Sequence, residues 1–149
     1  MNRRLLAAYR GTDYEAAGAV ARIGRRSQGV DALLRRLGAR EGAFVTAWNP
    51  WSRRMPPGWN ARMMARLREA ARRLPRAEGE GRGRGWSERH LLLAGDPRRA
   101  AALARRFRQN AIVVARVGAT ARLVPLRQTR AWMNKRRNGS STAPSACGG

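Results

Sequence analysis

Apolar residues recur along the chain with two different periods, which predicts a layered mixture of helices and strands. Val30, Leu33, Leu34 and Leu37 follow the spacing of one helical face. Ser27 can cap the start of this helix, and Gly38 can end it. Two more apolar stripes with helical spacing occupy residues 59–74, after Pro57, and residues 100–107, after Asp96 and Pro97. The pattern therefore predicts three amphipathic helices.

Short segments before, between and after these stripes have the composition of strands. These segments lie at residues 12–16, 19–23, 43–47, 91–94, 111–117 and 121–126. The expected order β-β-α-β-α-β-α-β-β indicates one small layered α/β or α+β domain over residues 5–127. The Gly, Arg and Glu-rich stretch 75–85 is expected to be a flexible loop, and 128–149 a disordered basic tail rich in Gly and Ser.

Composition adds a strongly basic charge to this picture. Among 149 residues, 32 Lys+Arg face 9 Asp+Glu, which gives a net charge of +23, and Lys135 is the single lysine. Such a charge favours nucleic acid or another polyanion as a partner. One His and one Cys cannot supply a zinc site, so we expect neither metal nor cofactor. With no apolar run long enough for a membrane span or a signal peptide, the expected location is cytoplasmic.

The stretch from Gly79 to Gly85 has the spacing G-x-G-x-G-x-G, which differs from that of a dinucleotide-binding loop and follows a predicted helix rather than a strand. We therefore expect a flexible segment, with the carboxylates of Glu78 and Glu80 solvated. His90 precedes an apolar strand without an identifiable nucleophile beside it. A structural or surface role for His90 is favoured over a catalytic one.

Polar residues cluster where predicted strands begin or end, which is where ligands bind in many layered folds. The candidates for such a polar site are Thr46, Trp48, Asn49, Asn60, Glu88, Gln109 and Asn110. Asn49 precedes a proline, which favours an extended backbone. Asn60 falls on the apolar face of its helix, so its amide must find buried partners.

Two readings of these amides stay open. They can satisfy backbone groups of a turn, or they can contact a ligand. Asn49 and Glu88 meet only if the strands beside them are antiparallel; parallel strands would place the two residues at opposite edges of the sheet. The sequence does not choose between these arrangements.

Several of these residues carry a family resemblance. The block Thr46-Ala-Trp-Asn-Pro50 with Ser52, then Asn60, then Gly85-Trp-x-Glu88, then Phe107-x-Gln-Asn-Ala111, resembles a bacterial family known as the domain of unknown function numbered 3293. The resemblance extends over roughly residues 9–127. It implies no particular activity, substrate or cofactor.

Two functional hypotheses follow. The first is a nucleic-acid-binding module that contacts phosphates, largely without sequence preference, through helix arginines. These arginines are Arg62, Arg66, Arg73, Arg98, Arg99, Arg105 and Arg106. The second is a small-molecule-binding protein or enzyme that uses the polar candidates. Charge alone favours the first.

Overall fold

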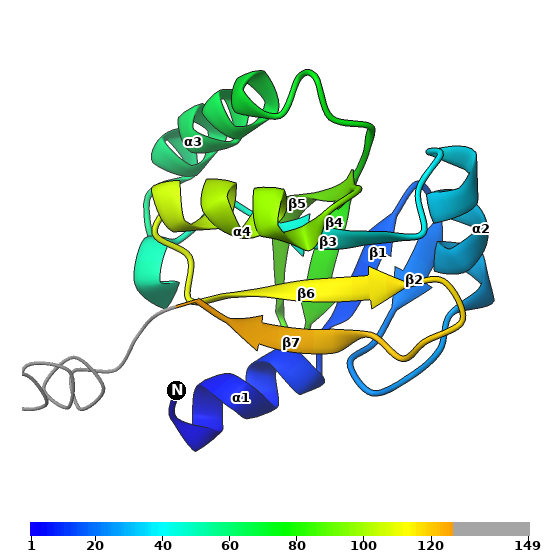
Figure 1. Cartoon of the computed structure of the whole chain (residues 1–149). Coiled ribbons are helices and arrows are strands. Elements are labelled where there is room, and N and C mark those ends of the chain that lie inside the picture. Colours follow the sequence, from blue (N-terminus) through cyan, green and yellow to red (C-terminus); the bar gives the residue numbers. More distant parts are fainter. Residues whose placement is uncertain (127–149) are drawn as a thin grey trace, which may run out of the picture.

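A computed structural model describes residues 1–126, so the expected tail lies outside the described part (Figure 1). The helices of this part are α1 (Arg3–Arg10), α2 (Gln28–Arg36), α3 (Pro57–Ala70) and α4 (Pro97–Arg106), with one short turn, η1 (Pro50–Ser52). Its strands are β1 (Asp13–Ala16), β2 (Ala19–Ala21), β3 (Glu41–Val45), β4 (Arg76–Gly83), β5 (Trp86–Ala94), β6 (Ala111–Arg116) and β7 (Arg122–Pro125).

The strands form one sheet in the order β2-β1-β4-β5-β3-β6-β7, and every pairing between these strands is antiparallel. The sheet curls until its two edges approach each other. Ile23, which follows β2, and Ala121, which precedes β7, form a parallel bridge. The backbone N–H of Gly24 donates a 2.8 Å hydrogen bond to the Ala121 carbonyl. The curl gives the sheet an inner and an outer face.

Each face has its own apolar core, because residues of a strand point alternately to the two sides. On the outer face, Val45, Leu91 and Ile112 pack against α3 and α4. On the inner face, Phe44 and Leu92 pack against α2. Helix α1 also lies over the inner face (Figure 1). The layered fold class predicted from periodicity is confirmed.

The helix caps expected from the sequence form as predicted. The Ser27 hydroxyl accepts the Val30 amide at 3.1 Å, and the Asp96 carboxylate accepts the Arg98 amide at 2.9 Å. Pro57 occupies the first turn of α3. These local signals hold because capping depends on residues three or fewer positions apart.

Two elements differ from the expected order. Residues 3–10 form α1, for which no helix was expected. More importantly, the expected loop at 75–85 is wrong, because residues 76–83 form β4 and pair with both β1 and β5. Glycine disfavours strands by itself, but tertiary pairing overrides that preference where a neighbouring side chain needs the space.

Strand β4 also decides the direction of β5. The chain leaves β3, crosses the outer face in α3, and runs along β4 parallel to β3 before turning back into β5. Strand β5 is therefore antiparallel to β3, which lies beside it. The last residues of β3 and the first residues of β5 therefore lie at the same end of the sheet.

Candidate functional site

The candidate polar residues lie at one end of the sheet. Val45, the last residue of β3, pairs with Leu91, so Glu88 in β5 lies beside the segment that follows β3. Strand β6 begins at Ala111 at this same end, directly after Gln109 and Asn110. Three chain segments that are remote in sequence thus deliver their polar residues to one place.

Asn49, Asn60 and Glu88 form a connected hydrogen-bond network. The Asn49 side-chain amide donates to Glu88 Oε1 at 2.8 Å, and the Asn60 amide donates to Asn49 Oδ1 at 3.1 Å. In return, Asn60 Oδ1 accepts the backbone N–H of Asn49 at 3.0 Å, and Asn49 Oδ1 accepts the backbone N–H of Met55 at 2.8 Å. The asparagines therefore satisfy backbone groups and also orient the Glu88 carboxyl group.

The backbone of Asn49 differs from the expected extended form. Its φ of 47° and ψ of 65° are left-handed, although Pro50 follows. Asparagine tolerates this region better than most residues, and the hydrogen bonds with Asn60 and Met55 hold it there. Trp51 and Ser52 also have positive φ, at 54° and 61°. Strained backbone of this kind clusters at functional sites.

The other polar candidates form hydrogen bonds that stabilise the turn after β3. Thr46 Oγ1 donates to the Arg89 carbonyl at 2.6 Å and accepts the Trp48 amide at 3.1 Å. The Gln109 amide donates to the Trp48 carbonyl at 3.0 Å. The Asn110 amide donates to the Ser52 hydroxyl at 2.7 Å. These contacts fix the turn after β3 against the loop that precedes β6.

A cavity of about 570 Å³ opens between this turn, the inner face of the sheet and α1. Six of the seven polar candidates line it, namely Thr46, Trp48, Asn49, Asn60, Glu88 and Gln109. Asn110 does not line the cavity. The volume is within the usual range of small-molecule sites.

The side chains of β5 that line one wall of the cavity explain why the neighbouring strand β4 contains glycines. Trp86, Glu88 and His90 alternate along β5 toward the inner face and pair with Gly83, Gly81 and Gly79. A Cβ at Gly83 would overlap the Trp86 indole, and one at Gly79 would overlap the Glu15 carbonyl. A Cβ at Gly81 would meet only ordinary contacts, 3.5 Å from Thr12 Cγ2 and 3.6 Å from His90 Nδ1. The glycine-rich stretch thus makes room for the cavity wall.

The opposite wall comes from α1, through Leu5, Ala8 and Tyr9. No residue of α1 is fully buried, so this helix covers the cavity without forming part of a core. Sequence reasoning missed Tyr9 and Trp86 as cavity residues. The alternation of Trp86 with Glu88 and His90 was the available signal for Trp86, whereas nothing local placed Tyr9 beside them.

Burial shifts the proton affinity of two facing groups in the cavity. Desolvation raises the pKa of Glu88 above its ordinary value, and the hydrogen bond from Asn49 opposes that shift. Among the described residues, none donates a hydrogen bond to the second carboxylate oxygen, Oε2. Desolvation and the nearby Glu88 charge raise the pKa of Tyr9 to about 12, against a hydrogen bond with Ser52. Tyr9 is therefore a phenol at neutral pH, and Glu88 is a carboxyl group that takes up a proton readily.

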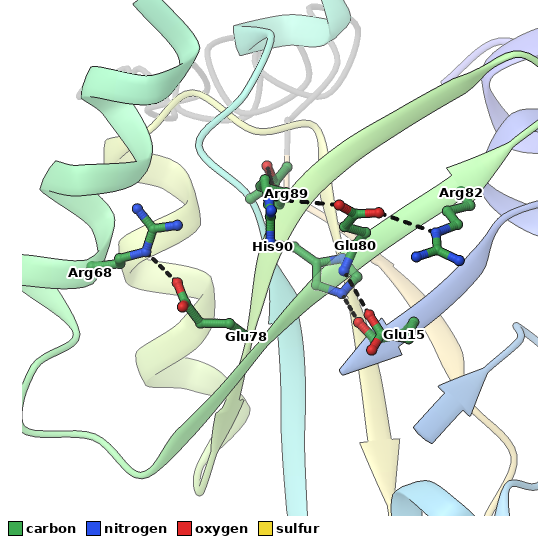
Figure 2. Close-up of polar contacts among 8 residues, drawn as sticks. Glu15, Arg68, Glu78, Glu80, Arg82, Arg89 and His90 are labelled. Atoms are coloured by element: carbon green, nitrogen blue, oxygen red, sulfur yellow. Dashed lines mark hydrogen bonds and ion pairs between the residues drawn. The ribbon is translucent and has the colours of Figure 1, made fainter. Parts of the chain in front are cut away.

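His90 is 4% exposed and lies between the rings of Tyr14 and Phe44. Its Nε2 is 2.5 Å from the Glu15 carbonyl, visible in Figure 2, so Nε2 carries the proton and Nδ1 is an acceptor. Desolvation lowers the pKa of His90. The surface alternative for His90 is therefore wrong, and the residue is a buried, neutral histidine.

The expectation that Glu78 and Glu80 lie in a loop is also wrong, although Glu78 is exposed to solvent as expected. Both lie in β4, where Glu78 contacts Arg68 of α3 and Glu80 lies between Arg82 and Arg89 (Figure 2). In residues 1–126, no group of three or more His, Cys, Asp or Glu side chains is placed to hold a metal ion. No helix within that range has the length and apolar character needed to cross a bilayer.

The seven candidate arginines are all exposed, and six of them lie on α3 and α4, which are side by side on the outer face (Figure 1). The expectation that Arg73 belongs to the same helix as Arg62 and Arg66 is wrong, because α3 ends at Ala70 and Arg73 lies in the turn that follows. Arg98 pairs with Asp96 at 2.8 Å, and the other six form no salt bridge with a described residue. Arg66 and Arg106 line one groove, and Arg73 and Arg99 line a second, smaller hollow. Arg62, Arg98 and Arg105 line neither.

Comparison with known proteins confirms the family resemblance. The model of a family described as "Protein of unknown function (DUF3293)" matches residues 45–112. This segment runs from the end of β3 to the start of β6 and contains all seven polar candidates. The chain matches no curated protein and no solved structure.

Proposed function

We propose that this protein binds a small organic molecule in the cavity under α1, and that Glu88 is the residue that recognises it. The observation that carries the proposal is the Glu88 carboxyl group itself. One of its oxygens is fixed by Asn49, and the other lacks a donor among the described residues. A partly desolvated carboxylate oxygen without a hydrogen-bond donor raises the free energy of the folded protein. A ligand that donates a hydrogen bond to this oxygen removes that penalty when it binds.

The remaining groups of the cavity favour a planar, polar ligand. Tyr9, Tyr14, Phe44, Trp48 and Trp86 supply aromatic surface. Flat rings gain from stacking or edge contacts with such walls. Acceptors at Glu88 Oε2 and His90 Nδ1, together with the hydroxyl of Tyr9, can fix the orientation of such a ring. A neutral heterocycle that carries N–H groups matches this set.

Glu88 also has the chemistry of a proton acceptor. Burial raises the pKa of Glu88 above its ordinary value, and a carboxylate with a raised pKa is a stronger base than an ordinary one. Asn49 holds it by Oε1, which leaves Oε2 for the ligand. If the protein is an enzyme, this geometry supports proton abstraction from the bound ring, with Glu88 as the base.

The test is a thermal-shift screen of the full chain against small rings with N–H groups: imidazole, nicotinamide, adenine, guanine and cytosine. A compound that binds should raise the melting temperature of the parent protein and of Glu78→Gln, which makes the same chemical change on the outer face. Glu88→Gln and Gly81→Ala, which change the acceptor and narrow the cavity, should lose this shift. The proposal is overturned if no compound stabilises the parent, or if both cavity variants respond as the parent does.

A further inference from the structure

A second concave surface lies on the outer face, away from the cavity under α1. A groove of about 830 Å³ runs between α3 and the C-terminal end of α4. Its lining combines arginines with two aromatic side chains: Arg66, Arg72, Arg106, Arg108, Trp59 and Phe107. One arginine from each predicted row, Arg66 and Arg106, therefore lies in this groove.

The charge of this groove is largely uncompensated. Arg66, Arg106 and Arg108 are exposed and form no salt bridge with any residue in the range 1–126. Arg72 pairs with Glu69 at 3.2 Å, and Glu69 is the one acidic residue in the lining. Guanidinium groups that lack protein partners are available for phosphate oxygens, which they bind in a bidentate manner.

The aromatic side chains distinguish this groove from a merely basic surface. Trp59 lies in α3, and Phe107 directly follows the last residue of α4. Both are half-buried, so each leaves part of its ring accessible within the groove. Unpaired bases stack on such rings, whereas the bases of a duplex are stacked on one another and offer only their edges. A cationic groove with aromatic surfaces is the usual design for single strands.

We propose that the groove between α3 and α4 binds single-stranded nucleic acid, with Arg66, Arg106 and Arg108 on the phosphates and Trp59 and Phe107 against the bases. This site is independent of the cavity under α1, because the two lie on opposite faces of the sheet and share no lining residue. Contacts to phosphates and base faces carry little sequence information, so we expect weak sequence preference.

Fluorescence anisotropy of the full chain with labelled 20-nucleotide oligo(U), oligo(dT) and a 20-base-pair DNA duplex tests the proposal. At 150 mM salt the single strands should bind more tightly than the duplex. Arg66→Glu/Arg106→Glu should weaken single-strand binding at least tenfold. The slope of log Kd against log salt concentration should also become less steep, by about 0.7 for each lost phosphate contact. Arg25→Glu/Arg26→Glu, exposed residues that line neither concave surface, make the same charge change and should weaken binding less than threefold.

A second variant tests stacking separately from charge. Trp59→Leu keeps the net charge and should weaken single-strand binding about fivefold or more, with duplex binding unchanged. Melting curves confirm that each variant is folded, and poly-glutamate serves as a polyanion without bases. Preference for the duplex, equal losses in the two double variants, no effect of Trp59→Leu, or competition by poly-glutamate as strong as that by oligo(U) would each overturn the proposal.

Discussion

Asn49 and Glu88 lie 39 positions apart in the chain and are joined by a 2.8 Å hydrogen bond from the Asn49 amide to the Glu88 carboxyl group. The bond exists because β5 runs antiparallel to β3, which places the last residues of β3 and the first residues of β5 at the same end of the sheet. Asn60 fixes Asn49 from α3 in turn. A strand, a turn and a helix therefore combine to orient one carboxyl group in a cavity, and the following expectations test that arrangement.

The half-buried carboxyl group of Glu88 should reduce the stability of the fold at neutral pH. The pKa of Glu88 is raised in the folded protein above the ordinary value of 4.5, so folding favours the protonated form. This favourable contribution is complete below the unfolded pKa and is lost as the pH rises through the folded pKa. Glu88→Gln keeps an acceptor for Asn49 and should melt at or above the temperature of the parent at pH 7.

The pH dependence of the difference in melting temperature between Glu88→Gln and the parent is the control for this prediction. The advantage of Glu88→Gln should shrink as the pH is lowered toward 4.5, where the parent's own carboxyl group becomes protonated. Melting temperatures of the parent and the variant at several pH values measure the difference. A difference that does not change with pH would show that Glu88 is not held in a desolvated environment.

The two asparagines should act as one structural unit. Asn49→Ala leaves the Met55 amide without its acceptor, and Asn60→Ala does the same to the Asn49 amide. Each change should lower the free energy of unfolding by about 1–3 kcal/mol. Because both belong to one network, the double variant should lose less than the sum of the two single losses.

Denaturant unfolding of the two single variants and the double variant measures that coupling. Asn49→Gly separates two effects, since glycine removes the amide but accepts the left-handed backbone that alanine resists. We expect it to be more stable than Asn49→Ala. Stability unchanged in both single alanine variants would mean that the amides serve a ligand rather than the turn.

The glycines of β4 should differ in their tolerance of a methyl group. Gly79→Ala should be the most destabilising, because its Cβ would overlap backbone atoms of Glu15. Gly83→Ala should cost less, since the overlapping Trp86 side chain is 41% exposed and can move. Gly81→Ala meets ordinary contacts, and reduced chain entropy in the unfolded state should stabilise it by about 0.4–1 kcal/mol.

Melting temperatures of the three single variants rank these effects under identical conditions. The order Gly81, Gly83, Gly79, from most to least stable, is the expected result. A loss at Gly81 as large as the loss at Gly79 would contradict the ordinary van der Waals contacts that the structure gives a methyl group at Gly81.

His90 should resist protonation. It is the single histidine of the chain, so its imidazole signals in an NMR titration need no assignment by mutation. Its pKa is lowered from the ordinary value of 6.5 by burial, so half-protonation should occur below pH 6.5. A lowered pKa contributes stability that is present above pH 6.5 and is lost as the pH falls through the folded pKa.

The same spectra report the tautomer, because ring nitrogen shifts differ for protonated and unprotonated nitrogens. The contact with the Glu15 carbonyl requires the proton on Nε2. A titration midpoint at or above 6.5, or a neutral form protonated at Nδ1, would contradict the buried environment described for His90.

Local signals in the sequence determined most of the secondary structure. The apolar stripes of α2, α3 and α4, the N-caps of α2 and α4, and the hairpin of β6 and β7 depend on residues a few positions apart. They form as expected, except that α3 ends at Ala70, before the end of its apolar stripe. The polar character of the turn after β3 and the burial of Asn60 were also readable, because an amide on an apolar helix face is forced inward.

Only the tertiary structure decided how those elements meet. The glycines of β4 have no strand signal of their own, and they form a strand because Trp86, Glu88 and His90 on the neighbouring strand need the space that missing side chains leave. That strand sets the direction of β5, and the direction of β5 brings Glu88 to Asn49. Periodicity records which side of an element is buried, whereas strand order depends on contacts between residues far apart in the chain.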